Sequence, residues 1–222
     1  MRQRRAGSRL RVAAWVLVPL GLVLALGGIG YARANYEGAT VTSEAMEPTY
    51  HPGDRLVIER IDAGEIRRGD VVLVDAPGRY HGKPVLQRVI GVGGDHVVGG
   101  DGDRVTVNGK PVEEPYVMRG EVNAGSGPYD VKVPDGRLFL LGDHRADSND
   151  SRFFLGEQSG SVAASGVHGY VQRDFTVPAV LVALGILGIV LALAGIGLGI
   201  GGYAAGRRAR RPLAAVPPWP VA

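Results

Sequence analysis

The sequence predicts a mostly β membrane protein, in which one antiparallel β domain lies between two transmembrane helices. Two long apolar runs without a charged residue, at residues 12–31 and 177–205, predict the helices. The stretch between them alternates short apolar segments with Gly, Asp, Asn and Pro, and has no long amphipathic helical pattern. Many short strands separated by turns are typical of an antiparallel β domain, which we expect to span residues 36–173.

The first apolar run is the predicted transmembrane helix 12–31, and a basic leader, residues 1–11, precedes it. About 20 apolar residues are needed to cross about 30 Å of hydrocarbon as a helix, and this run has that length. The alternative is a cleaved signal peptide, for which Ala32-Arg33-Ala34 offers an A-x-A-like site. The run is longer than the ~7–15-residue core of a secretory signal, which favours a retained span.

The second apolar run is the predicted transmembrane helix 177–205, rich in Leu, Ile, Val, Ala and Gly. It is longer than a membrane crossing requires, so we expect it to tilt or to end early, near Gly201 and Gly202. A basic, Pro- and Ala-rich tail, residues 206–222, follows it, and this composition is typical of a disordered segment.

The placement of charge predicts that both ends of the chain are cytoplasmic. Cytoplasmic flanks of membrane spans carry an excess of Lys and Arg. The basic residues that flank the two runs are Arg2, Arg4, Arg5, Arg9 and Arg11 before the first and Arg207, Arg208, Arg210 and Arg211 after the second. We therefore expect a protein that crosses the cytoplasmic membrane twice, with its folded domain on the outer face.

The central domain is acidic although the whole chain is basic. Residues 36–175 contain 15 Lys and Arg against 22 Asp and Glu, a net charge of −7, whereas the complete chain carries +3. An acidic domain argues against nucleic-acid binding, which needs a basic face on the folded part. The chain has no cysteine, and no His, Asp and Glu set has metal-ligand spacing, so we expect no disulfide, metal or cofactor.

Six strands are predicted within the domain. They are the apolar segments 55–58, 71–74, 85–92, 105–107, 131–133 and 138–141. Turns are predicted where Gly, Pro, Asp or Asn cluster, at 51–54, 68–70, 93–95, 108–109 and 134–136. Longer connections remain at 76–83 and 118–130, and we expect these loops to be mobile.

Five segments of unusual local sequence follow one another in the domain. They are residues 42–49 (TSEAMEPT), 68–72 (RGDVV), 87–95 (QRVIGVGGD), 107–117 (VNG, then EPYV) and 142–152 (GDHRADSNDSR). Each alone is ordinary loop chemistry, since Ser, Asp and Gly make turns. In this order, over residues 40–170, they resemble the boxes of bacterial signal peptidase I. That family cuts signal peptides from exported preproteins at the outer face of the cytoplasmic membrane, so the resemblance implies a β domain of signal peptidase type.

Both catalytic positions of that family are substituted in this chain. In the family the first box reads Ser-x-Ser-Met-x-Pro-Thr, with the Ser before Met as nucleophile, and a later box opens with Lys-Arg, the Lys being the general base. Here Ala45 occupies the nucleophile position and Gln87 the base position. Alanine has no attacking atom, and a glutamine amide does not titrate. Loss of either member of such a unit typically removes ~10⁴ to 10⁶ of rate.

Neighbouring residues do not replace this pair. Ser43 matches the family position whose hydroxyl helps to form the oxyanion hole, and it is displaced from Ala45 by about 6–7 Å of extended chain. Lys83 shares strand parity with Gln87, but four residues of strand place it ~13 Å away. Lys110 follows a predicted turn and is expected to be a solvated charge.

The remaining family positions are matched. The resemblance implies substrate-binding roles for Met46 and Pro48. It also implies a site-supporting role for Asp143, Ser148, Asp150 and Arg152. An Asp and an Arg two residues apart can brace a site by charge-assisted hydrogen bonds, which we expect of Asp150 and Arg152. His144 stands where the family often has Asn or His, and a hydrogen-bonded loop role is expected.

The sequence therefore predicts a catalytically impaired relative of signal peptidase I that binds preproteins, or a partner peptidase, at the outer membrane face. The expected partners are exported preproteins or their signal peptides, membrane lipid and an active signal peptidase. Two alternatives stay open: an active serine endopeptidase with an unorthodox nucleophile, Ser43 or a partner's residue, and an engineered form inactivated to trap substrate. Charge at Glu44 and Glu47 is expected to weaken docking of an apolar cleavage region.

Overall fold

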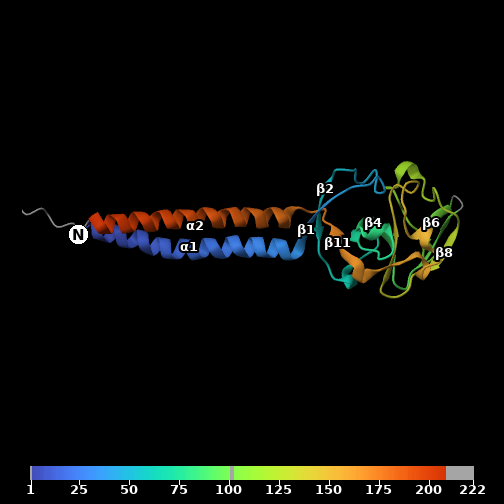
Figure 1. Cartoon of the computed structure of the whole chain (residues 1–222), viewed down its shortest axis with the longest axis horizontal. Helices are drawn as coiled ribbons and strands as arrows, with labels where there is room; N and C mark the ends of the chain where they lie inside the picture. Colours follow the sequence, from blue (N-terminus) through green and yellow to red (C-terminus); the bar gives the residue numbers. More distant parts are fainter. Residues whose placement is uncertain (1, 101–102, 209–222) are drawn as a thin grey trace, which may run out of the picture. The chain divides into compact units, whose positions relative to one another are not determined.

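The computed structural model describes residues 2–100 and 103–208 (Figure 1). The chain forms two compact units. One consists of the two apolar helices, and the other is a β domain that spans Ala34–Asp174.

The two apolar runs form continuous helices. Helix α1 spans Arg2–Asn35 and helix α2 spans Thr176–Arg208, and both contain windows long and apolar enough to cross a membrane, Ser8–Asn35 and Thr176–Arg207. The predicted spans 12–31 and 177–205 lie inside these helices, and α1 also takes in residues 2–11 of the basic leader. Of the predicted tail, residues 206–208 form the end of α2, and the rest lies outside the described residues.

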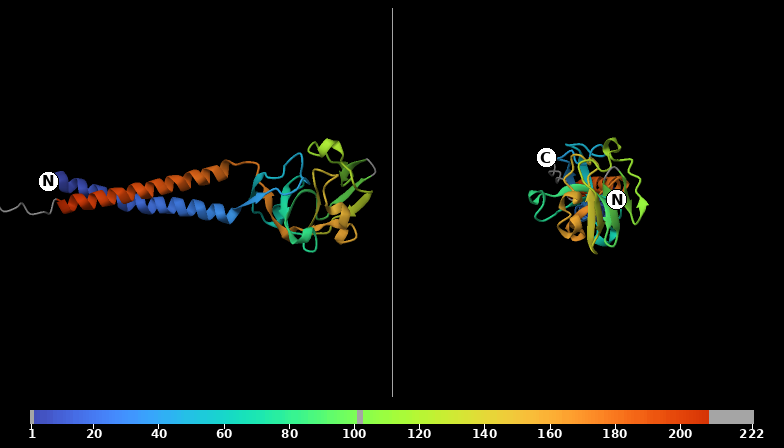
Figure 2. Two further views of the ribbon diagram at one scale, coloured as in Figure 1. Left: turned by 45° about the horizontal axis from the view of Figure 1, so that its top comes forward. Right: turned by 90° about the vertical axis from the view of Figure 1, so that its right-hand side faces the viewer.

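Glycine allows the two helices to approach to backbone contact. A Cβ atom on Gly21 would lie 2.5 Å from the carbonyl oxygen of Gly188, and one on Gly188 would lie 2.6 Å from that of Gly21. A larger residue at either position would force the helices apart. Small residues at such contacts are typical of membrane helices, whose association depends on close packing. The left view of Figure 2 shows the two helices crossing.

The β domain consists of two antiparallel sheets (Figure 1). The first has seven strands in the order β1 (Tyr36–Thr40), β2 (Arg55–Glu59), β11 (Val167–Val171), β3 (Val71–Val74), β4 (Val85–Val92), β9 (Arg137–Leu141) and β10 (Val162–Ala163). The second has four, in the order β7 (Lys110–Pro111), β6 (Asp103–Val107), β5 (His96–Gly100) and β8 (Tyr129–Lys132). Strand β2 thus lies between β1, which follows α1 in the chain, and β11, which precedes α2.

Short 3-10 helices lie in the connections. They are η1 (Ala63–Glu65), η2 (Tyr80–Gly82), η3 (Met118–Gly120), η4 (Ser151–Phe154), η5 (Gln158–Gly160) and η6 (Ala164–Gly166). The predicted loops 76–83 and 118–130 each contain one of them, η2 and η3. The mobility expected of these loops stays a prediction.

The predicted fold class, an antiparallel β domain with two long apolar helices, is confirmed. All six predicted strands form, and β3 and β4 have the predicted bounds. The predicted turns lie in connections between strands. Strands β1, β5, β7, β10 and β11 are not predicted by the sequence pattern. In β11 the reason is Gly169, which reads as a strand breaker. A Cβ atom there would lie 2.1 Å from the carbonyl oxygen of Glu59, so this strand needs glycine to pack against β2.

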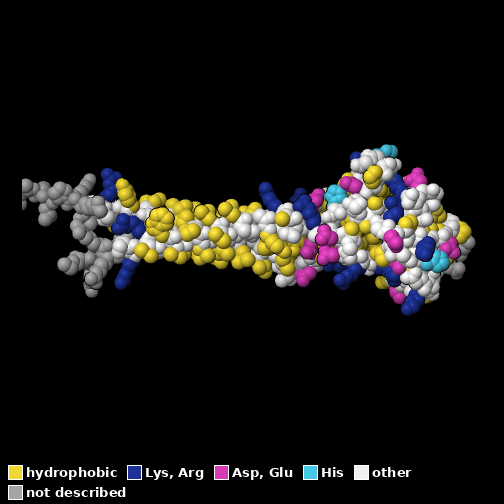
Figure 3. Space-filling view, turned by 90° about the horizontal axis from the view of Figure 1, so that it is seen from below, with side chains coloured by type: hydrophobic (Ala, Val, Ile, Leu, Met, Phe, Trp, Pro, Cys, Tyr) yellow, Lys and Arg dark blue, Asp and Glu magenta, His cyan; other side chains and the backbone are white. Residues whose placement is uncertain are grey.

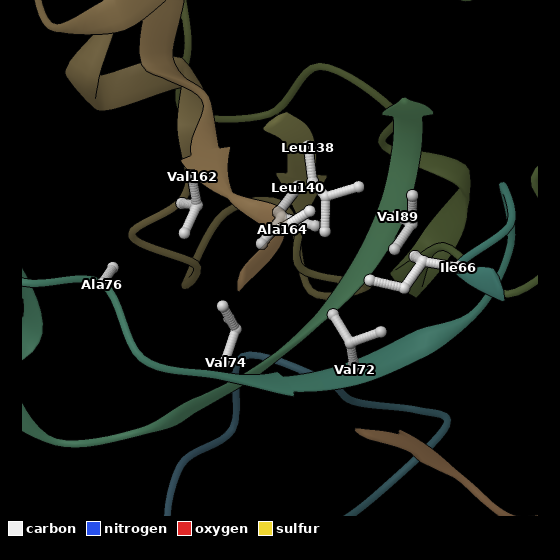
Figure 4. Packing of buried hydrophobic residues seen from close by; sticks show 9 residues of the cluster. All are labelled: Ile66, Val72, Val74, Ala76, Val89, Leu138, Leu140, Val162 and Ala164. Atoms are coloured by element: carbon white, nitrogen blue, oxygen red, sulfur yellow. The ribbon is translucent and has the colours of Figure 1, made fainter. Parts of the chain in front are cut away.

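Strands β4 and β9 are buried on both faces and separate two hydrophobic cores. The first core contains Ile66, Val72, Val74, Ala76, Val89, Leu138, Leu140, Val162 and Ala164 (Figure 4). The second contains Ile90, Val97, Val105, Val107, Tyr129, Val131, Val133, Phe139 and Leu141. Successive side chains of a strand point to opposite faces, so the apolar run 138–141 supplies both cores alternately. Burial of each such side chain stabilises the fold by about 1.5–3 kcal/mol, which fixes the two strands that support the candidate site.

Candidate active site

All five sequence boxes contact one another in the structure, and three of them carry Ala45, Gln87 and the loop 142–152. The segment 42–49 lies in the loop between β1 and β2, Gln87 lies on β4, and residues 142–152 form the loop after β9. The backbone N–H of His144 donates to the carbonyl oxygen of Ala45 at 3.0 Å. The Nε2 of Gln87 donates to the carbonyl oxygen of Asn149 at 2.9 Å. The positions predicted for nucleophile and base therefore both contact the loop 142–152.

Gly142 allows the first and last boxes to approach closely. A Cβ atom on Gly142 would lie 2.5 Å from the carbonyl oxygen of Ala45 and 2.2 Å from the Oγ of Ser148. These distances exclude a side chain at this position. Ala45 and Ser148 consequently both lie against the backbone of Gly142.

The segment around Ala45 is held by one buried side chain. Met46 is 1% exposed and packs with Ile58, Val71 and Val171 in a separate cluster. Ala45 is half-buried, whereas Ser43 and Pro48 are exposed. Met46 thus anchors the segment in the core and offers little free surface. The substrate-binding role of Met46 and Pro48, and the oxyanion-hole role of Ser43, stay predictions.

Gln87 is buried at the position predicted for the base, with 2% of its surface exposed. Its amide nitrogen is bonded to Asn149, but its Oε1 has no hydrogen-bond partner among the described residues. The Tyr80 hydroxyl lies close to it. Burial raises the pKa of Tyr80, and the proximity of Gln87 partly offsets that rise.

Several buried polar atoms in this region lack a hydrogen-bond partner among the described residues. They are Tyr80 Oη, Gln87 Oε1, His144 Nδ1 and Ser148 Oγ. A buried polar group without a partner costs about 1–3 kcal/mol. We call Ala45, Gln87, Tyr80 and Ser148 the dyad region; its hydrogen-bonding capacity is only partly used.

Arg88, the residue after Gln87, makes a fully paired contact with Asp143. The Arg88 Nε donates to Asp143 Oδ1 at 2.8 Å and an Nη to Oδ2 at 2.5 Å, with 2% of Arg88 and none of Asp143 exposed. The Thr49 hydroxyl also donates to Asp143. The Arg88 guanidinium stacks 3.8 Å from the ring centroid of Tyr116. Burial lowers the pKa of Arg88, but the hydrogen bonds and charge of Asp143 outweigh it and raise the pKa.

Asp150 and Arg152 form the pair that their spacing predicts. Arg152 donates through Nε to Asp150 Oδ1 at 2.7 Å and through an Nη to Oδ2 at 2.8 Å, and both side chains are 0% exposed. Asp150 also accepts from the backbone N–H of Gly142 at 3.2 Å. Arg152 reaches the carbonyl oxygens of Ala124 and Arg145. The pair therefore ties the loop 142–152 to the loop that contains η3.

A third buried pair, Arg145 with Glu114, is not predicted by the sequence pattern. The Arg145 guanidinium donates to the Glu114 carboxylate and, through Nε, to the carbonyl oxygen of Gly142 at 2.8 Å. Their side chains are 0% and 1% exposed. Glu114 belongs to the EPYV segment, which the sequence singles out. The sequence does not indicate that Glu114 pairs with Arg145, which is 31 residues away. We call the pairs Arg88–Asp143, Asp150–Arg152 and Arg145–Glu114 the bracing network.

The dyad region has no hydroxyl paired with a base. Ala45 supplies no attacking atom, Gln87 supplies no titrating group, and Ser43 is exposed. Within residues 2–100 and 103–208, no group of three or more His, Asp and Glu could hold a metal ion. The arrangement is a braced loop beside a buried, partly satisfied polar region.

Comparison with known proteins supports one family. The sequence model described as "Signal peptidase, peptidase S26" matches residues 11–176. Signal peptidase I of Bacillus licheniformis is 38% identical over 132 residues, which cover 54% of this chain and 68% of that protein. Signal peptidase I S of Bacillus subtilis is 31% identical over 167 residues, which cover 70% of this chain and 86% of that protein. The crystal structure of a signal peptidase I from Enterococcus faecalis superposes with a TM-score of 0.40 and a sequence identity of 27%. The match covers 49% of this chain and 97% of the Enterococcus chain.

Proposed function

Because this chain belongs to the signal peptidase family, peptidase S26, we propose that it is a membrane-bound member that binds exported preproteins without cutting them. The family implies preproteins with signal peptides as the ligand class. The chain spans about two thirds of the length of the Bacillus licheniformis enzyme, over which the two are similar. Binding without turnover separates this protein from that enzyme.

The observation that carries the proposal is the chemistry of Ala45 and Gln87. A serine peptidase needs a hydroxyl within hydrogen-bond reach of a base. The methyl group of Ala45 cannot attack a carbonyl, and the amide of Gln87 is fixed by its bond to Asn149 at 2.9 Å. Restoring a hydroxyl alone would still leave it without a base.

The bracing network supports retention of a binding surface. Its three ion pairs are buried and hydrogen-bonded, and none of them involves Ala45 or Gln87. The loop 142–152 and the segment 42–49 can therefore keep their shape when the dyad is absent. A peptide that lies along this surface would meet a braced backbone.

The proposed orientation has both termini in the cytoplasm and the β domain outside. It is supported by the arginines that flank the two helices and by the acidic character of residues 36–175. A partner peptidase in the same membrane is a second binding partner under this proposal.

The deciding experiment is cleavage of a preprotein by the purified full-length protein in phospholipid nanodiscs. We expect no product above background, with the Bacillus licheniformis enzyme as the active reference. Labelled signal peptide should nevertheless bind, measured by fluorescence anisotropy. Turnover comparable to that of the reference would contradict the proposal, and so would the absence of signal-peptide binding.

The double variant Ala45→Ser/Gln87→Lys tests whether the frame is intact. Position 87 is 2% exposed, so a lysine there would be desolvated, which lowers its pKa as a general base requires. The Tyr80 Oη, which lies close to position 87, can accept a hydrogen bond from it. We expect cleavage to appear in the double variant, and each single variant to stay near background because the two residues act as one unit.

The alternative of an active enzyme with Ser43 as nucleophile is separated by one further variant. If the unchanged protein cleaves preprotein, Ser43→Ala should abolish that cleavage under the alternative. Activity that survives Ser43→Ala would exclude Ser43 as the nucleophile. Ser165→Ala is the matched control, because it removes an exposed hydroxyl that lies outside both the segment 42–49 and the loop 142–152.

A further inference from the structure

An apolar groove lies between α1 and α2 at the end of the helix pair that carries Arg11 and Tyr203. It encloses about 530 Å³, a volume within the range of small-ligand sites. It is lined by Arg11, Ala14, Trp15, Val18, Pro19 and Leu22 of α1 and by Gly195, Ile196, Gly199 and Tyr203 of α2. The lining residues recur every three or four positions, so each helix contributes one face.

The groove exists because the helices diverge from their closest contact. A Cβ atom would meet the facing helix at 2.6 Å on Gly188, at 2.8 Å on Gly195 and at 3.4 Å on Gly199. The absence of side chains on Gly195 and Gly199 leaves the floor of the groove open. Larger residues at these positions would fill it.

The mouth of the groove has the side chains found at a membrane surface. Trp15 and Tyr203 are 81% and 64% exposed, and aromatic side chains of this kind gather at headgroup level. Arg11 lines the groove, and the Arg207 guanidinium lies 5.9 Å from the ring centroid of Tyr203. In Figure 3, hydrophobic side chains cover the visible surface of the helix pair, and Lys and Arg gather beside the grey terminal atoms.

We propose that this groove binds one anionic phospholipid, with an acyl chain along Gly195 and Gly199 and its phosphate beside Arg11 and Arg207. Apolar walls match the acyl chain, and two guanidinium groups match the phosphate by charge-assisted hydrogen bonding. Basic pockets between membrane helices on the cytoplasmic side recognise anionic headgroups in this way. The proposal does not depend on whether the β domain cuts preproteins.

Charge also decides against the other apolar occupant, the helix of a signal peptide. Signal peptides carry a positively charged segment on the cytoplasmic side of their apolar core. In the groove that segment would lie beside Arg11 and Arg207, where like charges repel. An anionic lipid gains from the same charges that exclude the peptide.

The fluorescence of Trp15 provides the test, because this residue lines the groove. The chain has two tryptophans, so Trp219→Phe leaves Trp15 as the only tryptophan, which can be excited selectively over tyrosine. The full-length variant is placed in nanodiscs of phosphatidylcholine that contain a small fraction of brominated lipid. Brominated phosphatidylglycerol should quench Trp15 more strongly than the same fraction of brominated phosphatidylcholine. Equal quenching by the two lipids would overturn the proposal.

Charge variants separate a built site from general attraction. Arg11→Gln and Arg207→Gln should each lower the preference for phosphatidylglycerol about fivefold, since one basic residue near the surface adds about 1 kcal/mol and 1.4 kcal/mol is tenfold. Arg9→Gln removes the same charge at the same end of the helix pair but outside the groove. This variant should lower the preference for phosphatidylglycerol less than Arg11→Gln does. An equal loss of preference in Arg9→Gln would mean that basic residues attract anionic lipid without a specific site, and would overturn the proposed site.

A groove-filling variant tests the acyl-chain contact. Gly199→Leu should abolish the preference, whereas Gly201→Leu, on the same helix with nothing within 4 Å of its added Cβ, should leave it intact. Retention of the preference in Gly199→Leu would overturn the proposed position. Relief of quenching by an added synthetic signal peptide would overturn the choice of occupant.

Discussion

The dyad region and the bracing network are adjacent in the chain but opposite in how their polar groups are satisfied. Gln87 and Arg88 are consecutive residues of β4, and both are 2% exposed. Arg88 is paired with Asp143, bonded to the carbonyl oxygen of Gly69 and stacked on Tyr116, whereas Gln87 has one hydrogen bond and an unpartnered oxygen. The difference teaches that the stability of this site lies in its frame. Changes at Ala45 or Gln87 need not unfold the loops around them.

Removing a bracing charge should have the largest effect on stability. Arg88→Met leaves the Asp143 carboxylate at 0% exposure without its cationic partner, and breaking such a buried pair costs about 3–5 kcal/mol. The measurement is the free energy of unfolding of the full-length protein, by urea titration in detergent. The matched variant Arg88→Met/Asp143→Asn removes both charges and should recover part of the loss. Equal losses in the single and double variants would show that the ion pair is not the cause.

A side chain added at Gly142, where the first and last boxes touch, should lower the free energy of unfolding by an intermediate amount. In Gly142→Ala the added Cβ would lie 2.2 Å from Ser148 Oγ and 2.5 Å from the Ala45 carbonyl oxygen. Overpacking of this kind typically costs about 1–3 kcal/mol. Gly156→Ala is the control, because nothing lies within 4 Å of its added Cβ. If both variants unfold at the same urea concentration, the close packing at Gly142 does not constrain the site.

Replacing Gln87 should cost much less than replacing its neighbour. Gln87→Met deletes an oxygen that has no partner and leaves the Asn149 carbonyl without one donor. These two changes oppose each other, so the free energy of unfolding should change by less than about 1 kcal/mol. Arg88→Met is the comparison on the same strand. A loss as large as that of Arg88→Met would contradict the contrast between the two regions.

At neutral pH, Tyr80→Phe should change the free energy of unfolding least of all these variants. The difference in stability between variant and parent should shift in favour of the variant at alkaline pH. Burial raises the pKa of Tyr80, so the neutral phenol is favoured in the folded protein. This contribution to stability is complete below pH ~10, where tyrosine of the unfolded chain ionises, and is lost as pH rises towards the folded pKa. The variant should therefore lose less stability than the parent between about pH 9 and about pH 11. An unchanged pH dependence in urea titrations would show that Tyr80 ionises as in the unfolded chain.

The fold could be predicted where local pattern and packing agree. Strands β3 and β4 were predicted to the residue because β4 is buried on both faces and flanked by turns. Strand β1 was missed because its Glu37 and Gly38 read as a linker. Strand β11 was missed because Gly169 reads as a breaker until Glu59 is known to lie against it. Pairing between strands far apart in the chain leaves little trace in either sequence.

The contacts of the candidate site could be predicted where the two side chains of a pair lie close together in the sequence. The Asp150–Arg152 pair follows from a spacing of two residues. The assignment of Ala45 and Gln87 to the nucleophile and base positions rests on box order and stays a prediction. The pairing of Arg145 with Glu114 required the tertiary structure, because an arginine in a loop can pair with any acidic group in reach. The unpartnered state of Ser148 was equally inaccessible to the sequence, since it depends on what surrounds a buried atom.

Strand β2 has a mechanical consequence that follows from its place in the first sheet. It pairs on one side with β1 and on the other with β11, and these are the strands by which the chain leaves for α1 and α2. Tension on α1 is therefore delivered to β1, which pairs with Arg55–Glu59, and tension on α2 is delivered to β11, which pairs with Ile58 and Glu59. A pull on both helices would therefore load Ile58 and Glu59 from both neighbouring strands at once.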